Sequence, residues 1–495
     1  MQIESYRTRL EEFEQKLNRE LYRYYSGIKE RLETVTLYAD YSDLFCIESI
    51  RESESAFESE TFESRRKSLQ KIHEFLMDRY LDCHTAAVTE EIMSFEASRT
   101  LMWEGKELPA SDVPARLRTE IHAFKRRKLA ERQAQVLADS GELVQRRTAQ
   151  LRAAADRLGF KDYIEARERI SHVQHEMLAD SFDEILGRLE DKYSEQFRIS
   201  LEAALGIPLH ETGSWDVSHW EAKNDQPRVF SWRNLTGVVE MAVAEMDIRP
   251  EYSEAIALDL QQRPGKKPGA FCIPVRVPQE IKIVMTPDDG SRHYAALLHE
   301  TGHACHLAWT SPSLPMEHRL WGDRAVCECY GFLLEHFIYE REWLARMLLF
   351  PASGNFLRFQ ALYRIFLIRR CVGKLRFGIS LHRQQSFDDA PHIYSEIMET
   401  YTGLRHLPES WILDSFDGFA SAEYLRGWLL EGMLREYMRT RYGNAWALNR
   451  SASGFLKEIW ETGLLYDADE LCREIGIGDL EPQALADELW KGLQD

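Results

Sequence analysis

Two histidines and a glutamate lie within five residues in the segment YAALLHETGHACHLAW, which runs from Tyr294 to Trp309. On an α-helix, residues i and i+4 lie on one face, so His299 and His303 point the same way, about 40° apart around the axis. Two imidazoles in this arrangement can bind one zinc ion, and Glu300 between them is placed to accept a proton from a metal-activated water. The spacing therefore predicts a zinc site that carries its own general base, and Gly302 leaves room beside it for close packing or substrate approach.

A helix that carries histidines for structural reasons is the alternative. The chain offers its own comparison in the segment HVQHEMLAD, where His175 and Glu176 are followed by Ala179 at the position of the second histidine. We interpret that segment as structural. Around His299 and His303, by contrast, apolar residues precede the motif and small residues surround it, which favours a buried functional helix.

A catalytic zinc ion needs three protein ligands and an open position for water, so a third ligand must come from elsewhere. The segment LWGDRAVCECYGFLLEHF offers four candidates, which are Asp323, Cys327, Glu328 and Cys329. Neighbours on a helix point about 100° apart, so only one or two of them can face a metal. Glu335 follows Glu328 by seven residues and shares its helix face, so it either orients a ligating histidine or remains a solvated acid.

Three segments in this order resemble the M3 family of zinc oligopeptidases, and in particular its oligoendopeptidase F-like branch. They are LDLQQRPGKKPGAFCIP (Leu258 to Pro274), LLHETGHACH (Leu297 to His306) and CECYGFLLEH (Cys327 to His336). Their order and spacing are far more specific than the histidine motif alone. The resemblance covers about 80 residues well, and the helical first half agrees only in texture.

The resemblance implies that Glu328 is the third zinc ligand, with Asp323 as the second choice because its shorter spacing is that of thermolysin-like enzymes. It implies a helical ellipsoid of two lobes around a deep channel, with one zinc ion per chain on the channel floor and a small sheet next to the motif helix. It also places Gly269, Ala270 and Phe271 on a strand beside the peptide substrate. An exposed strand edge suits that role because an extended peptide can pair with its free N–H and C=O groups; a tight turn that needs glycine is the alternative.

The C-terminal part departs from the family pattern. In the segment ESWILDSFDGFASAEYLRGW (Glu409 to Trp428), Tyr424 falls on a tyrosine that the resemblance assigns to oxyanion stabilisation. The family's histidine position falls on Phe416 and another tyrosine position on Ala422. His406 is nearby but out of register. Tyr424 is therefore expected either to donate a hydrogen bond in catalysis or to be an ordinary core tyrosine.

Apolar spacing predicts a mainly helical fold with one small sheet. Helical patterns cover residues 6–28 and 63–103, and a stretch rich in Pro, Gly and β-branched residues, from Arg263 to Ser291, predicts a few short strands, with IKIVM as the best candidate. We expect a helical N-terminal lobe over residues 1–205 and a catalytic region over 206–495, intertwined as one continuous body.

The composition excludes several classes of partner. The chain has 495 residues and a formal net charge of −19, and a surface of this charge repels the phosphates of a nucleic acid. The basic run FKRRKLAERQAQ has the character of a solvated helix face. No 18-residue apolar stretch exists, so no membrane span is expected. The eight cysteines lack the spacing of a disulfide scaffold, which favours reduced thiols and a cytoplasmic location.

These observations predict a zinc peptidase that hydrolyses short peptides. A carboxypeptidase or dipeptidase of the same helical fold, as in the M32 and M2 families, is an alternative. A second is a zinc-containing protein that binds peptides with weak or no turnover, and a third is a metal-free helical scaffold. Peptide length, cleavage preference and oligomeric state are not predicted.

Overall fold

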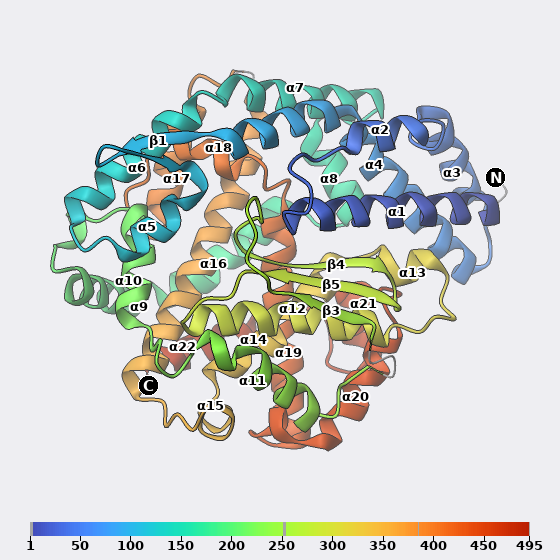
Figure 1. Cartoon of the computed structure of the whole chain (residues 1–495). Coiled ribbons are helices and arrows are strands. Elements are labelled where there is room, and N and C mark those ends of the chain that lie inside the picture. Colours follow the sequence, from blue (N-terminus) through green and yellow to red (C-terminus); the bar gives the residue numbers. More distant parts are fainter. Residues whose placement is uncertain (1–2, 251–253, 385, 495) are drawn as a thin grey trace.

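Helices make up most of both halves of the chain, which confirms the mainly α class (Figure 1). The computed structural model describes residues 3–250, 254–384 and 386–494. The α-helices of the first half are α1 (Ile3–Tyr25), α2 (Thr34–Asp40), α3 (Ile47–Ser59), α4 (Glu63–Ser98), α5 (Val113–Thr119), α6 (Ala123–Ala138), α7 (Gly141–Arg157), α8 (Tyr163–Ser171), α9 (His175–Leu205), α10 (Val217–Asn224) and α11 (Trp232–Glu245). Those of the second half are α12 (Ser291–Trp309), α13 (Met316–Leu320), α14 (Arg324–Glu335), α15 (Arg341–Leu348), α16 (Gly354–Arg383), α17 (Ala390–Thr402), α18 (Trp411–Asp414), α19 (Ala420–Tyr442), α20 (Arg450–Glu461), α21 (Ala468–Glu474) and α22 (Gln483–Gly492).

The structure adds a two-stranded hairpin where the sequence predicts the end of a long helix. Helix α4 ends at Ser98, and the residues TLMW form strand β1 (Thr100–Trp103), which pairs antiparallel with β2 (Lys106–Pro109). The two residues between the strands, Glu104 and Gly105, have φ angles of 49° and 80°. A two-residue turn with positive φ at both positions matches the twist of a hairpin, so the local turn overrides the apolar spacing that suggested helix.

A three-stranded sheet lies directly before the motif helix, as the sequence predicts. Its strands are β3 (Ile256–Asp259), β4 (Ala270–Arg276) and β5 (Glu280–Met285), in the order β3-β5-β4. Strand β5 contains the predicted IKIVM segment and runs parallel to β3 and antiparallel to β4. Strand β4 is therefore at the edge of the sheet.

The sheet joins the two halves of the chain. Alternate side chains of β5, including Ile281 and Ile283, pack into the core with α12, whereas Val284 faces the tyrosines of α1 on the opposite side. Helix α1 is held on the sheet by the side-chain amide of Asn18, which donates a hydrogen bond of 2.9 Å to the Pro274 carbonyl. Figure 1 shows the sheet between α1 and α12.

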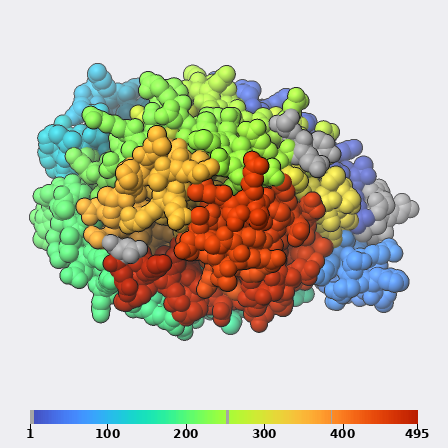
Figure 2. Space-filling view, turned by 90° about the horizontal axis from the view of Figure 1, so that it is seen from below, coloured from blue at the N-terminus to red at the C-terminus, as the bar shows by residue number. Residues whose placement is uncertain are grey.

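The regions 1–205 and 206–495 share a hydrophobic core. One cluster of buried side chains extends from Leu10 and Phe13 in α1 to Leu489 in α22 and Leu493. In the view from below, the C-terminal elements, coloured red, fill the middle of the face, with green and orange segments beside them (Figure 2). Among the described residues, no helix combines the length and the apolar character needed to cross a bilayer.

Candidate metal centre

The motif helix α12 is fixed at its N-terminus by a carboxylate from another helix end. Asp225, which follows α10, accepts a hydrogen bond of 2.8 Å from the backbone N–H of Ser291. The guanidinium of Arg118 in turn holds Asp225 at 2.9 Å. A negative charge at a helix N-terminus is favourable because it pairs with unsatisfied N–H groups and the helix dipole. Since Leu297 and Leu298 are buried in the core, this anchoring sets which way the remaining faces of α12 point.

Three glycines allow α12, α14 and α19 to approach one another at the site. A Cβ atom at Gly302 would lie 2.1 Å from the carbonyl oxygen of Tyr330 in α14. A Cβ at Gly331 would lie 2.7 Å from Cε1 of His299, and one at Gly427 would lie 2.6 Å from Cβ of Glu328. Gly302 therefore serves close packing of α12 on α14, one of the two roles that the sequence suggests for it.

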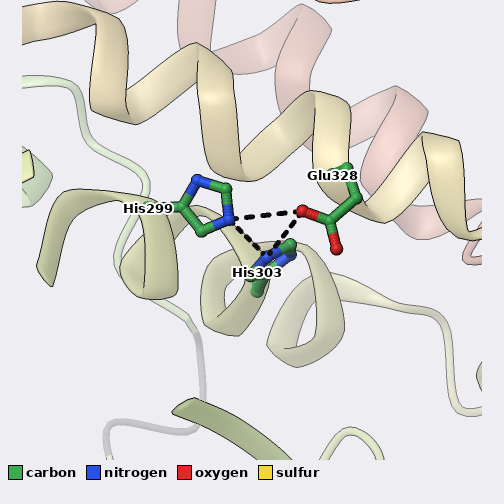
Figure 3. Close-up of side chains that lie close together, drawn as sticks. All are labelled: His299, His303 and Glu328. Carbon is green, nitrogen blue, oxygen red and sulfur yellow. Dashed lines mark hydrogen bonds and ion pairs between the residues drawn. The ribbon is translucent and has the colours of Figure 1, made fainter. Parts of the chain in front are cut away.

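His299, His303 and Glu328 converge in the structure (Figure 3). The Nε2 atoms of the two histidines are 3.0 Å apart. Glu328 Oε2 lies 3.3 Å from Nε2 of His299 and 3.7 Å from Nε2 of His303. Among the described residues this is the group of His, Cys, Asp or Glu side chains with ligand atoms close enough to share a metal ion, all within 4.8 Å of one another.

The donor set fits a divalent cation. Glu328 Oε2 is buried, and within the described part of the chain it receives no hydrogen bond of normal geometry. Burial lowers the pKa of His303 to about 3, so its imidazole is neutral and can act as a ligand. Two imidazole nitrogens and a carboxylate oxygen that face one another are stable only if a proton or a cation lies between them. Nitrogen and oxygen donors of these types are those that zinc takes in catalytic sites.

His299 is oriented by a second carboxylate. Its Nδ1 atom lies 3.0 Å from Glu335 Oε2, and the hydroxyl of Tyr339 donates to the other oxygen of Glu335 at 3.3 Å. Burial would lower the pKa of His299, but the carboxylates of Glu328 and Glu335 outweigh it and raise the pKa well above its usual value. An Nδ1–H that donates to a carboxylate leaves Nε2 for a metal, which is the arrangement that fixes the tautomer of ligating histidines.

Glu300 lies beside the three converging side chains, between α12 and strand β4. Burial raises the pKa of its carboxyl group to about 7, while a hydrogen bond from the backbone N–H of Cys272 in β4 acts in the opposite direction. A carboxyl group with a pKa near neutrality can both accept and return a proton at physiological pH. Because β4 is an edge strand, this N–H also shows that its outer edge faces the site.

Tyr424 of α19 is at the site and reaches solvent. It is 37% exposed, and its ring centroid is 6.1 Å from that of Phe332, which in turn packs edge-on against His299 at 4.9 Å. The negative charge of Glu328, together with burial, raises the pKa of Tyr424 far above its usual value. Its hydroxyl therefore keeps its proton and can donate a hydrogen bond beside the candidate ligands.

The other candidate ligands of the same segment have different roles. Asp323, the second choice for the third ligand, is the N-cap of α14 and accepts from the N–H of Ala325 at 3.0 Å. Its other oxygen accepts from Arg426 at 2.6 Å and from the backbone of Ala468 at 3.0 Å. Both oxygens are thus occupied, so Asp323 does not converge with the histidines, and neither do Cys327 and Cys329.

The three residues at or near the other donor positions of the resembled pattern make packing contacts or hydrogen bonds with neighbouring side chains. Phe416 packs at the edge of a hydrophobic cluster and carries the guanidinium of Arg147 over its ring, 4.9 Å from the centroid. Ala422 is 2% exposed. The Nε2 atom of His406 lies 3.0 Å from the hydroxyl of Thr402, and burial lowers its pKa to about 4. None of the three replaces the missing donors at the candidate metal centre.

The segment predicted to lie beside the substrate begins the edge strand. Gly269 precedes β4 with a φ of 110°, a conformation that favours glycine, so the turn that was the alternative is also present. Ala270 packs on the α12 side, whereas Phe271 points to α1, where its ring lies 4.5 Å from that of Tyr25. The side chain of Phe271 is therefore turned away from α12 and the candidate metal centre.

The segment HVQHEMLAD, with His175 and Glu176, has a structural role, as the sequence suggests. His175 begins α9 and is buried, with its ring stacked on Phe419 at 4.3 Å. Glu176 is on the surface and pairs with Arg383 at 2.5 Å. Sequence reasoning did not single out Arg324, Glu423, Tyr339 and the Cys272 backbone, which surround the site. The position of Arg324 one turn before Glu328 was the one signal that could have found it.

Comparisons with known proteins extend the structural evidence. No protein-family model matches the sequence, and no curated protein matches it. The fold is similar to that of a structure assigned as oligoendopeptidase F from Bacillus anthracis str. Ames, with 16% identity and a TM-score of 0.66 over 96% of this chain and 85% of that one. It is also similar to PZ peptidase A with a bound inhibitor, with 16% identity and a TM-score of 0.70 over 96% and 85% of the two chains. A second structure assigned as oligoendopeptidase F gives 14% identity and a TM-score of 0.69 over 96% and 86%. The chain thus has the helical oligoendopeptidase fold over nearly its whole length.

Proposed function

We propose that this protein is a zinc-dependent peptidase that hydrolyses short peptides, with Glu300 as its general base. The observation that carries the proposal is the convergence of His299, His303 and Glu328, with Glu300 beside them, in a chain whose fold is that of solved oligoendopeptidases. His299, His303 and Glu328 would hold the ion. When bound, zinc supplies a Lewis acid that polarises a carbonyl group and makes water more acidic.

The chain's own residues account for the proton transfers. Glu300, with a pKa raised to about 7 by burial, accepts a proton from the attacking water and passes it to the leaving amine. The Cys272 N–H keeps the carboxylate in place beside β4. Tyr424 is placed to donate a hydrogen bond to the oxyanion that forms at the scissile carbonyl, a contribution that is typically worth about 3 kcal/mol.

No strand of the described residues pairs with the outer edge of β4, and this edge gives a reason for peptides as the substrate class. An extended peptide that pairs with this edge would run past Glu300, because the edge is directed at that carboxylate. Gly269 and Ala270 carry little or no side chain at the start of the strand, so a second backbone can approach closely. The side chain of Phe271 lies against α1, on the face of the sheet away from α12.

The test is the Glu300→Gln variant, which keeps the size of the side chain but removes its basicity. We expect it to bind zinc as the wild type does and to lose peptide hydrolysis by about 100-fold or more. The matched control is Glu176→Gln in the segment HVQHEMLAD. Glu176 pairs with Arg383 on the surface, so this variant should not change turnover. Fragments of a mixed peptide library are measured by mass spectrometry, and zinc by elemental analysis. Wild-type rates in Glu300→Gln would remove Glu300 from the mechanism, and intact peptides with zinc-loaded wild type would favour a peptide-binding protein.

A further inference from the structure

Arg324, near the candidate metal centre, has guanidinium N–H groups without a partner among the described residues. It is the first residue of α14, one helical turn before Glu328, and 67% of its side chain is exposed. Its ion pair with Glu423 of α19 uses Nε, at 3.1 Å from Oε2. Within residues 3–250, 254–384 and 386–494, no other hydrogen bond or ion pair of Arg324 is present. Both Nη groups therefore remain available.

Arg426 shows what a structural arginine looks like at the same helix end. It is 8% exposed, and its guanidinium donates to Asp323 at 2.6 Å and to Asp469 at 3.2 Å. These two contacts join α19 to α14 and α21. Arg324 joins α14 to α19 through one nitrogen, although a guanidinium has five N–H donors in a fork that matches a carboxylate. Its exposure therefore leaves most of its binding capacity unused.

Arg324 shares a face of α14 with the candidate ligand Glu328, because residues four apart on a helix lie on the same side. Its partner Glu423 directly precedes Tyr424 in α19. The guanidinium is therefore held between the helix that carries a candidate ligand and the helix that carries the proposed oxyanion donor.

We propose that Arg324 determines substrate specificity by binding a carboxylate of the peptide near the scissile bond. The inference rests on the proposed peptidase function. One helical turn is about 5.4 Å, so Arg324 begins that distance along α14 from the candidate ligand Glu328. The carboxylate can belong to an acidic side chain or to the C-terminus of the peptide, and both offer the same two oxygens to the free Nη groups. The ion pair with Glu423 holds the guanidinium in place through Nε while its Nη edge meets the substrate.

The kinetic test compares wild type with Arg324→Gln on matched fluorogenic peptides. One series places Asp or Asn at each position on either side of the cleaved bond, and a second compares free and amidated C-termini. We expect wild type to prefer the carboxylate at one position by about 10- to 100-fold in kcat/KM, mostly through KM, and Arg324→Gln to lose that preference. The position at which the preference lies distinguishes a side chain from a C-terminal carboxylate.

Two further variants keep the result interpretable. Arg324→Lys retains the charge without the fork and should keep part of the preference. Arg346→Gln removes an exposed arginine of α15 that pairs with Glu245 of α11 at 2.6 Å. This variant should leave the preference intact. Equal kcat/KM ratios for acidic and neutral peptides in wild type, or an unchanged ratio in Arg324→Gln, would overturn the proposal.

A binding measurement separates this proposal from the proposed function. Fluorescence anisotropy of the same labelled peptides on zinc-loaded Glu300→Gln protein reports affinity without turnover. If wild type cleaves none of the peptides, the proposed function fails. Arg324 is then still supported if acidic peptides bind about tenfold more tightly than neutral ones and the double variant with Arg324→Gln loses the difference. Equal affinities in the two proteins would reject Arg324 as a carboxylate-binding residue, whatever the activity.

Discussion

Replacing Gly331 with alanine should damage the candidate metal centre although no candidate ligand is replaced. The new Cβ atom would lie 2.7, 2.8 and 3.0 Å from Cε1, Nε2 and Nδ1 of His299. Carbon atoms in contact are normally at least about 3.5 Å apart, so the imidazole must move by about 0.8 Å. Metal–ligand distances vary by only about 0.2 Å, and the hydrogen bond that holds Nδ1 on Glu335 would also be strained.

The expected loss is about 10- to 100-fold in zinc affinity, the usual effect of disturbing the groups that orient a ligating histidine. Forcing an extra methyl group into a packed site costs about 1–3 kcal/mol, against which alanine gains about 0.5–1 kcal/mol over glycine in a helix. The zinc-free variant should therefore be no more stable than the wild type.

The matched control is Gly187→Ala in α9, where a Cβ atom meets nothing within 4 Å. It should stabilise the protein by about 0.5–1 kcal/mol and leave zinc binding unchanged. Chelator competition measures the affinity and urea unfolding the stability. If Gly331→Ala bound zinc like the wild type and gained stability like the control, the packing argument for His299 would be wrong.

Tyr424 and His382 allow two other tests. Tyr424→Phe removes the hydroxyl beside Glu328 and should lower kcat by about 100-fold or more with little change in zinc content, whereas an unchanged kcat would make Tyr424 a packing residue. Burial lowers the pKa of His382 to about 3, so the unfolded chain takes up this proton first as the pH falls below about 6.5. Because of this residue, the free energy of unfolding should fall by about 1.4 kcal/mol for each pH unit between about pH 6.5 and pH 3. In His382→Met, the slope of the unfolding free energy against pH should be shallower by that amount. Equal slopes for the two proteins would show that His382 is not held neutral by the fold.

Helical spacing predicted part of the candidate metal centre from the sequence. His299 and His303 share a face at four residues, and Glu335 shares the face of Glu328 at seven, so the geometry is local once the helices form. The choice of Glu328 over Asp323 needed the family resemblance, because both residues have acceptable spacing. The structure gives the physical reason for it, since Asp323 is used up as a helix cap and as a partner of Arg426.

The groups that surround the ligands could not be predicted, because distant segments supply them. The Cys272 N–H reaches Glu300 only when β4 is at the sheet edge, and Gly427 matters only because α19 crosses α14 at Glu328. The hairpin at Thr100 was missed for a local reason. Two residues with positive φ, one of them Glu104, decide the turn, and apolar spacing does not report it.

Anomalous diffraction from zinc-replete crystals, with data on both sides of the zinc absorption edge, would locate the proposed ion. We expect one strong anomalous peak per chain, within about 2.0–2.2 Å of Nε2 of His299, Nε2 of His303 and the carboxylate of Glu328. A site without anomalous signal under these conditions, with the Glu328 carboxylate directed away from both imidazoles, would contradict this expectation.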